Sequence, residues 1–170
     1  ALGSELGMAA VLEAAGKQVR IVNGHRTPPN LAFLDPGNQI EAIEDLEGDP
    51  SADVDVLMVL DTSAWVQLGE MADVVRQTTA TRVVLDHHKS GDDLGATELK
   101  DVSAEATGAL VVEAADALGV PLSEAIARPL FAAIATDTGW FRFPATSSRT
   151  YQVAGRLTEA GASPAEIYGQ

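Results

Sequence analysis

Hydrophobic residues along the chain recur in two patterns, one typical of helices and one typical of buried strands. The first is amphipathic: apolar residues recur at helical spacing over 3–16, and Gly16 can end a helix there. The second is an almost continuous apolar run over 54–60 (VDVLMVL), and a shorter apolar segment follows in 81–85 (TRVVL). Because runs of this kind are typical of strands buried on both faces of a parallel sheet, both segments are predicted to be such strands.

Weaker signals place the other elements. A short strand is predicted over 18–23, and the acidic stretch 41–50 predicts a helical turn that ends at Gly48. Pro129 is expected to kink the helix that contains it or to shift its start. The remaining predicted elements are helices defined by apolar periodicity and capping residues. Two of them span 66–78 and 147–160, one begins at Ser123, and a last one is opened by Ser163 and Pro164. Another is capped by Asp101 or Ser103 and runs to about Leu118, with Gly119 after it.

The order of these elements predicts the fold class. Helix, strand, helix, strand and then several helices is the order expected for an α/β fold, with a mainly parallel sheet sandwiched by helices. A length of 170 residues suits one domain, and no internal repeat or low-complexity linker divides the chain. We therefore expect a single domain over 1–170.

Composition and charge narrow the kind of protein. Hydrophobic residues make up 46% of the chain and charged residues 21%, as in ordinary globular proteins, and no apolar run is long enough to cross a bilayer. Cysteine is absent, which excludes disulfides and thiolate metal sites. We expect a cytoplasmic protein that does not associate with membranes. The net charge of −14, with 11 basic residues spread along the chain, opposes binding of long nucleic acid, so a phosphate-bearing substrate would be small or would need positive charge from metal ions or a second domain.

Candidate chemistry gathers where the two central strands end. Asp61 follows the first strand directly, and Asp86, His87 and His88 follow the second. Ligands of open parallel sheets bind at the carboxyl ends of the strands, so these side chains are expected to face one crevice. Carboxylates and imidazoles that converge there are costly unless a cation neutralises them. A divalent metal ion would do so.

Asp137 is a third candidate, because it ends an apolar helix and Gly139 follows it in a turn. An acid at a helix C-terminus faces the negative end of the helix dipole, and metal ligation would compensate for that. Each of these acids and histidines alone has an ordinary structural interpretation, as a turn former, a cap or a packed side chain. Together they favour a metal site, and Asp with His but no Cys suits Mn²⁺, Fe²⁺ or Zn²⁺ better than Ca²⁺.

These motifs resemble those of the DHH phosphoesterase superfamily, which includes RecJ-type exonucleases, nano-RNases that also dephosphorylate phosphoadenosine phosphate, cyclic-dinucleotide phosphodiesterases and family II inorganic pyrophosphatases. Asp61 in LDTS resembles the second motif of the superfamily. The triplet Asp86-His87-His88 resembles the third motif, which gives the superfamily its name, and Asp137 in TDTGWF resembles the fourth. The resemblance runs in order over essentially the whole chain.

The resemblance implies a role for each of these residues. Asp61 would bridge two Mn²⁺ ions, with Mg²⁺ as the alternative metal, and His87 and Asp137 would hold one of the two ions. Asp86 would orient an imidazole through a hydrogen bond, and His88 would support the site in a similar way or contact the substrate phosphate. All five are therefore candidate catalytic residues, and Asp61, His87 and Asp137 are the candidate metal ligands.

Residues after the DTG turn are candidates for substrate binding, together with His88. Arg142 and Arg149 could hold a phosphate as bidentate donors, and the alternative for both is an ordinary surface arginine. Trp140 and Phe141 could stack on a base, and the alternative is that they belong to a hydrophobic core.

The resemblance also bears on the two ends of the chain. In the nano-RNase group, a strand that ends in His-x-x-x-Asp-x-Asp comes immediately before Ala-Leu-Gly-Ser, and the segment 1–7 resembles the continuation of that motif. We therefore expect that the first motif, with three metal ligands, precedes Ala1. A C-terminal substrate-binding domain is expected after Gln170. The segment 1–170 alone is expected to hydrolyse its substrate weakly or not at all.

The function implied by the resemblance is Mn²⁺-dependent hydrolysis of short oligonucleotides or nucleotide 3′-phosphates by a metal-activated water, because Ala-Leu-Gly-Ser and the loop with Pro28, Pro29 and Asn30 are most similar to the nano-RNase group. Two alternatives stay open: a cyclic-dinucleotide phosphodiesterase or inorganic pyrophosphatase, and a DHH domain that binds nucleotides without catalysis. The expected partners are short RNA or DNA, or a nucleotide phosphate. A homodimer is the assembly considered.

Overall fold

The structure, a computed structural model, describes residues 1–170 and divides into two compact units. Unit 1 comprises Ala1–Val19 and Ser103–Gln170, and unit 2 comprises Arg20–Val102. The chain thus begins in unit 1, builds the whole of unit 2, and then returns to unit 1.

Unit 2 contains two parallel sheets. One has the strands β1 (Ile21–Asn23) and β2 (Ile40–Ala42), and the other has the order β3 (Val56–Leu60), β4 (Thr81–Asp86) and β5 (Thr97–Lys100). The register of the central pair sets Leu60 opposite Leu85, so β3 and β4 end side by side. The helices of this unit are short: η1 (Pro29–Leu34), η2 (Ile43–Asp45), α2 (Trp65–Leu68) and α3 (Met71–Gln77).

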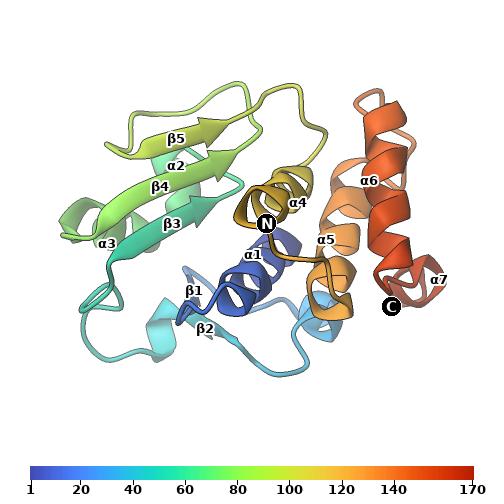
Figure 1. Cartoon of the computed structure of the whole chain (residues 1–170). Helices are drawn as coiled ribbons and strands as arrows, with labels where there is room; N and C mark the ends of the chain where they lie inside the picture. The colour runs from blue at the N-terminus through green and yellow to red at the C-terminus, as the bar shows by residue number, and fades with distance from the viewer. The chain divides into compact units, whose positions relative to one another are not determined.

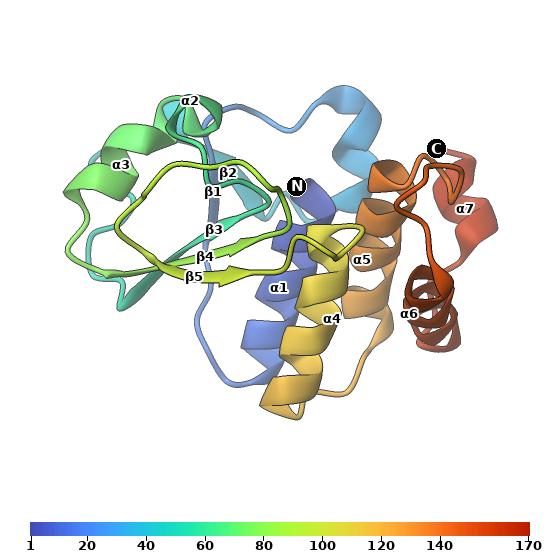
Figure 2. The ribbon, with the colours of Figure 1, turned by 90° about the horizontal axis from the view of Figure 1, so that it is seen from above.

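The core of unit 2 lies between the three-stranded sheet and α3. Figures 1 and 2 show α2 and α3 on one face of β3, β4 and β5. Four buried side chains meet there, namely Val59, Val75, Val84 and Leu94. Burial of an aliphatic side chain contributes about 1.5–3 kcal/mol relative to leaving it in water. This small core therefore fixes the ends of β3 and β4, from which the candidate site is built.

Unit 1 is helical, and α5 is its centre. Its helices are α1 (Leu2–Ala14), α4 (Thr107–Leu118), α5 (Glu124–Asp137), α6 (Ser148–Glu159) and α7 (Pro164–Tyr168), and α5 packs against each of the others. A Cβ atom at Gly3 would lie 2.3 Å from the carbonyl oxygen of Pro129, and one at Gly7 would lie 2.2 Å from Leu130 Cδ2. The two glycines thus let α1 and α5 approach closely. None of the helices combines the length and hydropathy that a bilayer-spanning helix requires.

The predicted α/β class with parallel strands is confirmed, since every strand pair in the structure is parallel. Several predicted helix ends are confirmed as well. Ser123 is the N-cap residue of α5, Gly119 ends α4 with φ of 68°, and the Ser163 hydroxyl accepts a hydrogen bond from the backbone of Glu166 at the start of α7. α5 begins where Ser123 predicts and continues through Pro129, so the proline does not shift its start.

The predictions for two segments need correction. The segment 41–50, predicted to hold a helical turn that ends at Gly48, begins within β2 (Ile40–Ala42), and its single turn η2 ends at Asp45. The predicted burial of 54–60 on both faces is wrong at its start, where Val56 is 53% exposed. Val56 pairs with Thr81, which is also exposed, so both lie at the end of the sheet away from the core.

Two helix predictions are also wrong at their boundaries. The segment 66–78 forms two helices instead of one, because Gly69 adopts φ of 53° between α2 and α3. The helix expected after Asp101 or Ser103 begins only at Thr107. The backbone N–H of Asp101 donates to the carbonyl of Asp86, so this residue continues the pairing of β4 and β5 and is not a helix cap.

Candidate metal centre

Asp61 leaves the sheet directly after β3. Its backbone N–H donates to the carbonyl of Leu85 at 2.9 Å, which extends the pairing of β3 and β4 by one residue. Its φ of 67° lies in the left-handed region, which is uncommon for a residue with a side chain and is tolerated best by Asn and Asp. The turn ends the strand and holds the Asp61 carboxylate beside the end of β4.

His87 faces Asp61 from the end of β4. The distance from His87 Nε2 to Asp61 Oδ1 is 3.6 Å, and the two side chains are 17% and 12% exposed. This distance is longer than a hydrogen bond of about 2.7–3.2 Å. It is shorter than the roughly 4.2 Å that can separate two ligand atoms each about 2.1 Å from one ion. The pair therefore has the spacing of two ligands that share a cation.

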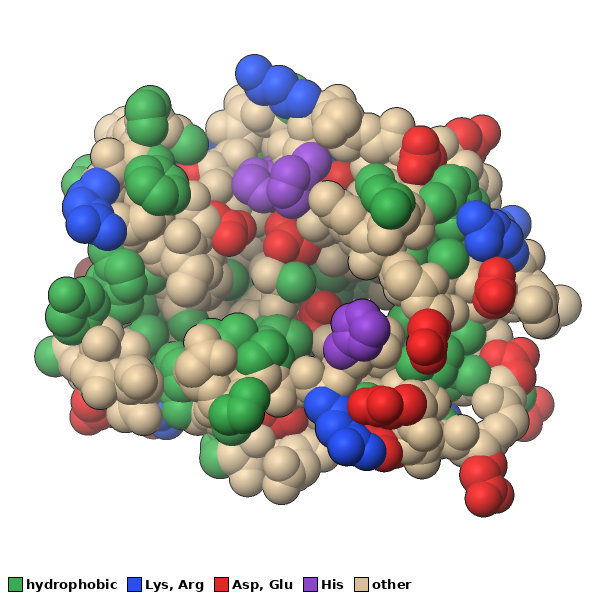
Figure 3. Space-filling model, turned by 180° about the vertical axis from the view of Figure 1, so that it is seen from behind, with side chains coloured by type: hydrophobic (Ala, Val, Ile, Leu, Met, Phe, Trp, Pro, Cys, Tyr) green, Lys and Arg blue, Asp and Glu red, His purple; other side chains and the backbone are tan.

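His88 completes a group of three potential ligands with Asp61 and His87. One ligand atom from each of the three residues lies within 4.8 Å of the others. The two imidazole centroids are 4.4 Å apart with the rings tilted by 59°, so the rings do not stack flat against each other. Histidine side chains reach the surface on the face shown in Figure 3. The His88 side chain is 46% exposed, so a small ligand can approach this group from solvent.

Asp86 lies behind the histidines and is fully buried. Its Oδ1 accepts hydrogen bonds from the backbone N–H of His88 at 3.1 Å and lies 2.7 Å from His88 Nδ1. Its Oδ2 accepts a hydrogen bond from the Ser63 hydroxyl at 2.8 Å. Burial raises the pKa of the Asp86 carboxyl, but the hydrogen bonds from His88 and Ser63 outweigh burial and hold the pKa below its usual value. Asp86 therefore orients the imidazole of His88.

Ser63 and Lys100 belong to the same network, although sequence reasoning did not single them out. Lys100 Nζ donates to the Ser63 hydroxyl at 3.0 Å and lies 3.6 Å from Asp86 Oδ2. Ser63 stands two residues after Asp61, and this closeness in sequence could have identified it as a candidate site residue. Lys100 ends β5, a strand that the sequence did not predict, so nothing in the pattern placed its side chain near Asp86.

The remaining candidate residues lie in unit 1. Asp137 is the last residue of α5 and is partly buried, and because it belongs to the other unit its place beside Asp61 and His87 stays a prediction. Arg142 donates from Nε to the carbonyl of Gly139 at 2.7 Å, and Arg149 forms an ion pair with Glu113 on α4. Substrate binding by either arginine also stays a prediction, and Arg149 would have to exchange Glu113 for a phosphate.

The two aromatic residues after the DTG turn pack within unit 1. The ring centroid of Trp140 lies 4.8 Å from that of Tyr168, edge to face, and Phe141 stacks on Tyr151 at 5.6 Å. Both rings also lie near Phe131. These contacts favour a packing role for Trp140 and Phe141 over stacking on a base.

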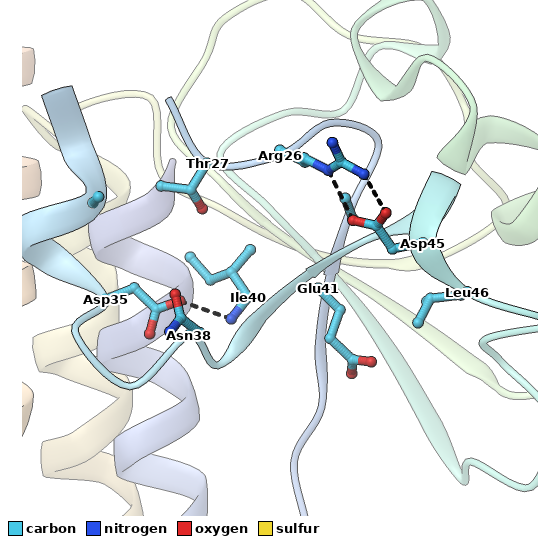
Figure 4. Close-up of a pocket in the computed structure, with 10 residues that line it drawn as sticks. Arg26, Thr27, Asp35, Asn38, Ile40, Glu41, Asp45 and Leu46 are labelled. Atoms are coloured by element: carbon cyan, nitrogen blue, oxygen red, sulfur yellow. Dashed lines mark hydrogen bonds and ion pairs between the residues drawn. The ribbon is translucent and has the colours of Figure 1, made fainter. Parts of the chain in front are cut away.

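A hollow in unit 2, apart from the group of Asp61, His87 and His88, has a volume of about 420 Å³ and lies beside β2 (Figure 4). Its charged groups are engaged with other charged side chains or with the backbone. Arg26 Nε donates to Asp45 at 2.9 Å, and the buried carboxylate of Asp35 accepts backbone N–H groups of Gln39 and Ile40, each at 2.8 Å. These contacts hold the loop between β1 and β2 in shape. The chemistry of unit 2 is therefore concentrated at the ends of β3 and β4.

Fold and site together define an α/β protein with a candidate divalent-metal site at the carboxyl ends of parallel strands. No protein-family model matches the chain. Among solved structures, the chain is similar to an exopolyphosphatase-related protein from Bacteroides fragilis, with a TM-score of 0.92 and 23% identity over 99% of this chain and 51% of that one.

A second solved structure with a similar fold comes from Methanococcus jannaschii and is proposed to be a family II inorganic pyrophosphatase. The TM-score is 0.71 and the identity 21%, over 99% of this chain and 54% of that one. The chain thus spans about half the length of both proteins. At these identities the likeness establishes the shared α/β fold.

Proposed function

We propose that this chain is the metal-binding part of a divalent-metal-dependent phosphoesterase of the DHH superfamily. The observation that carries the proposal is the pair His87 Nε2 and Asp61 Oδ1, 3.6 Å apart at the ends of two neighbouring parallel strands. The DHH, LDTS and TDTGWF motifs support it. So do the two similar structures, whose names refer to polyphosphate and pyrophosphate chemistry.

The residues present fit a divalent ion. Asp61 and His87 would hold it, and Asp137 would join them as the resemblance implies. Bound divalent ions lower the pKa of a coordinated water and stabilise negative charge that develops on a phosphate during hydrolysis. His88, held by Asp86 and 46% exposed, is available to meet the substrate phosphate from the side of the solvent. Mixed Asp and His ligands suit Mn²⁺, with Mg²⁺ as the alternative.

The proposed substrates are short oligonucleotides or nucleotide 3′-phosphates. The net charge of −14 opposes long polyanions, whereas a short substrate needs few phosphate contacts. Inorganic polyphosphate or pyrophosphate is the second candidate substrate. The names of the two similar structures favour it, because both refer to the hydrolysis of phosphoanhydrides.

The test measures hydrolysis by the encoded protein with Mn²⁺ or Mg²⁺ on four substrates: a dinucleotide, phosphoadenosine phosphate, a cyclic dinucleotide and pyrophosphate. We expect metal-dependent release of mononucleotide or phosphate from at least one of the first two. His87→Gln and Asp61→Asn should each lower the rate at least a hundredfold and weaken Mn²⁺ binding measured by calorimetry. Chelation of the metal should abolish the activity.

His25→Gln is the matched control, because it removes an imidazole from an exposed loop outside the ligand group. It should leave both the rate and Mn²⁺ affinity unchanged. If folded His87→Gln and Asp61→Asn keep the full rate, the assignment of the metal ligands is wrong. Cleavage of pyrophosphate alone would select the second candidate. Nucleotide binding without hydrolysis of any substrate would instead support a non-catalytic DHH domain.

A further inference from the structure

The buried carboxylate of Asp86 is surrounded on both oxygens. His88 contacts Oδ1 through its backbone N–H and its ring, whereas Ser63 and Lys100 contact Oδ2. Burial of an isolated carboxylate is strongly unfavourable, so these partners are needed for it to remain charged. Among them, Lys100 supplies a full positive charge, and its side chain is only 17% exposed.

The direction of the hydrogen bonds is set by the Lys100 ammonium, which can only donate. Lys100 Nζ donates to the Ser63 oxygen at 3.0 Å, so the Ser63 hydroxyl proton is left to donate to Asp86 Oδ2 at 2.8 Å. Asp86 is ionised and accepts only. The ring nitrogen Nδ1 of His88, 2.7 Å from Oδ1, must then carry its proton. The chain of donors therefore runs from Lys100 to Ser63 to Asp86, and His88 donates to the same carboxylate from the other side.

The backbone around Ser63 leaves little space for a different arrangement. A Cβ atom at Gly91 would lie 2.0 Å from Ser63 Oγ and 3.2 Å from Lys100 Nζ. The backbone N–H of Asp92 also donates to the Ser63 carbonyl at 2.8 Å. The loop after the histidines is thus packed directly over the Ser63 hydroxyl and the Lys100 ammonium.

We propose that Lys100 and Ser63 are positioning residues that fix the tautomer and the direction of the His88 imidazole through Asp86. With Nδ1 protonated, the lone pair of Nε2 points away from Asp86 and is available to a metal ion or to a proton shared with a phosphate. The inference rests on the proposed function only for its effect on catalysis. Its structural part concerns the metal-free protein.

The first test uses nitrogen-15 NMR of the imidazole rings in the metal-free protein at alkaline pH. The chain has only three histidines, so His25→Gln and His87→Gln spectra assign the signals of His88. We expect the Nδ1–H tautomer for His88 in the unmodified protein. Lys100→Met and Ser63→Ala should each move His88 toward a mixture with the Nε2–H tautomer, while the backbone spectrum keeps the folded pattern.

Lys17→Met is the matched control for these variants. It also removes one lysine charge, but from an exposed position in the loop after α1. It should leave the His88 signals where they are. An unchanged His88 tautomer in both Lys100→Met and Ser63→Ala would overturn the inference.

A chemical rescue separates the Lys100 charge from a general effect on folding. The chain has no cysteine, so Lys100→Cys can be alkylated at that single position. Bromoethylamine restores an ammonium on a side chain of nearly the same length, whereas iodoacetamide leaves a neutral adduct. The aminoethylated protein should recover the Nδ1–H tautomer of His88 and the neutral adduct should not. Equal spectra for the two adducts would contradict a role for the charge.

Activity provides the second readout. Loss of a residue that orients a histidine in a metal site lowers affinity or rate roughly 10- to 100-fold, and we expect this range for kcat in Lys100→Met. The two proposals can fail separately. If the tautomer shifts as expected but the protein hydrolyses none of the substrates, the proposed function is wrong and the positioning network stands. If hydrolysis depends on His87 but Lys100→Met changes neither kcat nor the tautomer, only the positioning role is wrong.

Discussion

Asp61 combines a candidate ligand with a backbone conformation that disfavours most side chains. At φ of 67°, a residue with a Cβ atom is less stable than glycine by about 1 kcal/mol. Asp61→Gly should therefore be more stable than Asp61→Ala by about that amount, because both variants lose the carboxylate and only alanine keeps the strain. Urea unfolding of the metal-free proteins measures the difference, and both variants should bind Mn²⁺ much more weakly than the unmodified protein. Equal stability of the two variants would show that the turn relaxes around alanine.

At the scale of single residues, the sequence predicted which residues lie at the ends of β3 and β4, but it did not predict the hydrogen bonds and ion pairs between them. Asp61, Asp86, His87 and His88 could be named because a strand that ends in an acid is visible in the pattern. The structure brings these side chains together within unit 2. Which histidine Asp86 orients is decided by a turn geometry that has no signature in the sequence, and the contact of Lys100 depends on β5.

Among the elements, the buried ones were predictable and the exposed ones were not. The strand segment 81–85 ends in three successive apolar residues and was found, whereas Thr97, Glu98 and Leu99 of β5 are exposed and carry no hydrophobic alternation. β5 forms because it pairs in parallel with β4, which is a contact between distant parts of the chain. Local patterns cannot report a partner of that kind.

The close approach of α1 and α5 gives a prediction for glycines in helices. Gly3→Ala places a methyl group 2.3 Å from the carbonyl oxygen of Pro129, and backbone cannot move aside as a flexible side chain can. We expect it to lower the free energy of unfolding by about 1–3 kcal/mol. Gly155→Ala, in the exposed part of α6 with nothing within 4 Å, should raise it by about 0.5–1 kcal/mol. Thermal unfolding of the two variants checks the opposite signs, and a stabilised Gly3→Ala would contradict the packing of α1 on α5.

For the whole molecule, each unit carries one of the two tryptophans, Trp65 in unit 2 and Trp140 in unit 1. Trp140→Phe and Trp65→Phe therefore give proteins whose fluorescence reports on one unit at a time. Mn²⁺ bound by Asp61 and His87 should raise the free energy of unfolding reported by Trp65 by roughly 2.7 kcal/mol at a hundredfold excess over Kd, and so move the urea midpoint of that signal upward. If Asp137 shares the ion, as the resemblance implies, the Trp140 signal should rise with it. A rise confined to Trp65 would remove Asp137 from the ligand set.

The prediction of one domain over 1–170 can be judged by the same experiment, from whether the two signals change together.

The path of the chain through the two units also has a consequence for its synthesis. α1 ends at Ala14, but its principal neighbour α5 begins only at Glu124. At roughly 5–20 residues per second, a ribosome needs on the order of 5–20 s to supply the missing helix. All of unit 2 is synthesised within that interval, while the side of α1 that carries Gly3 and Gly7 is not yet packed against α5. During synthesis, α1 therefore gains its principal packing partner only after the whole of unit 2 has been made.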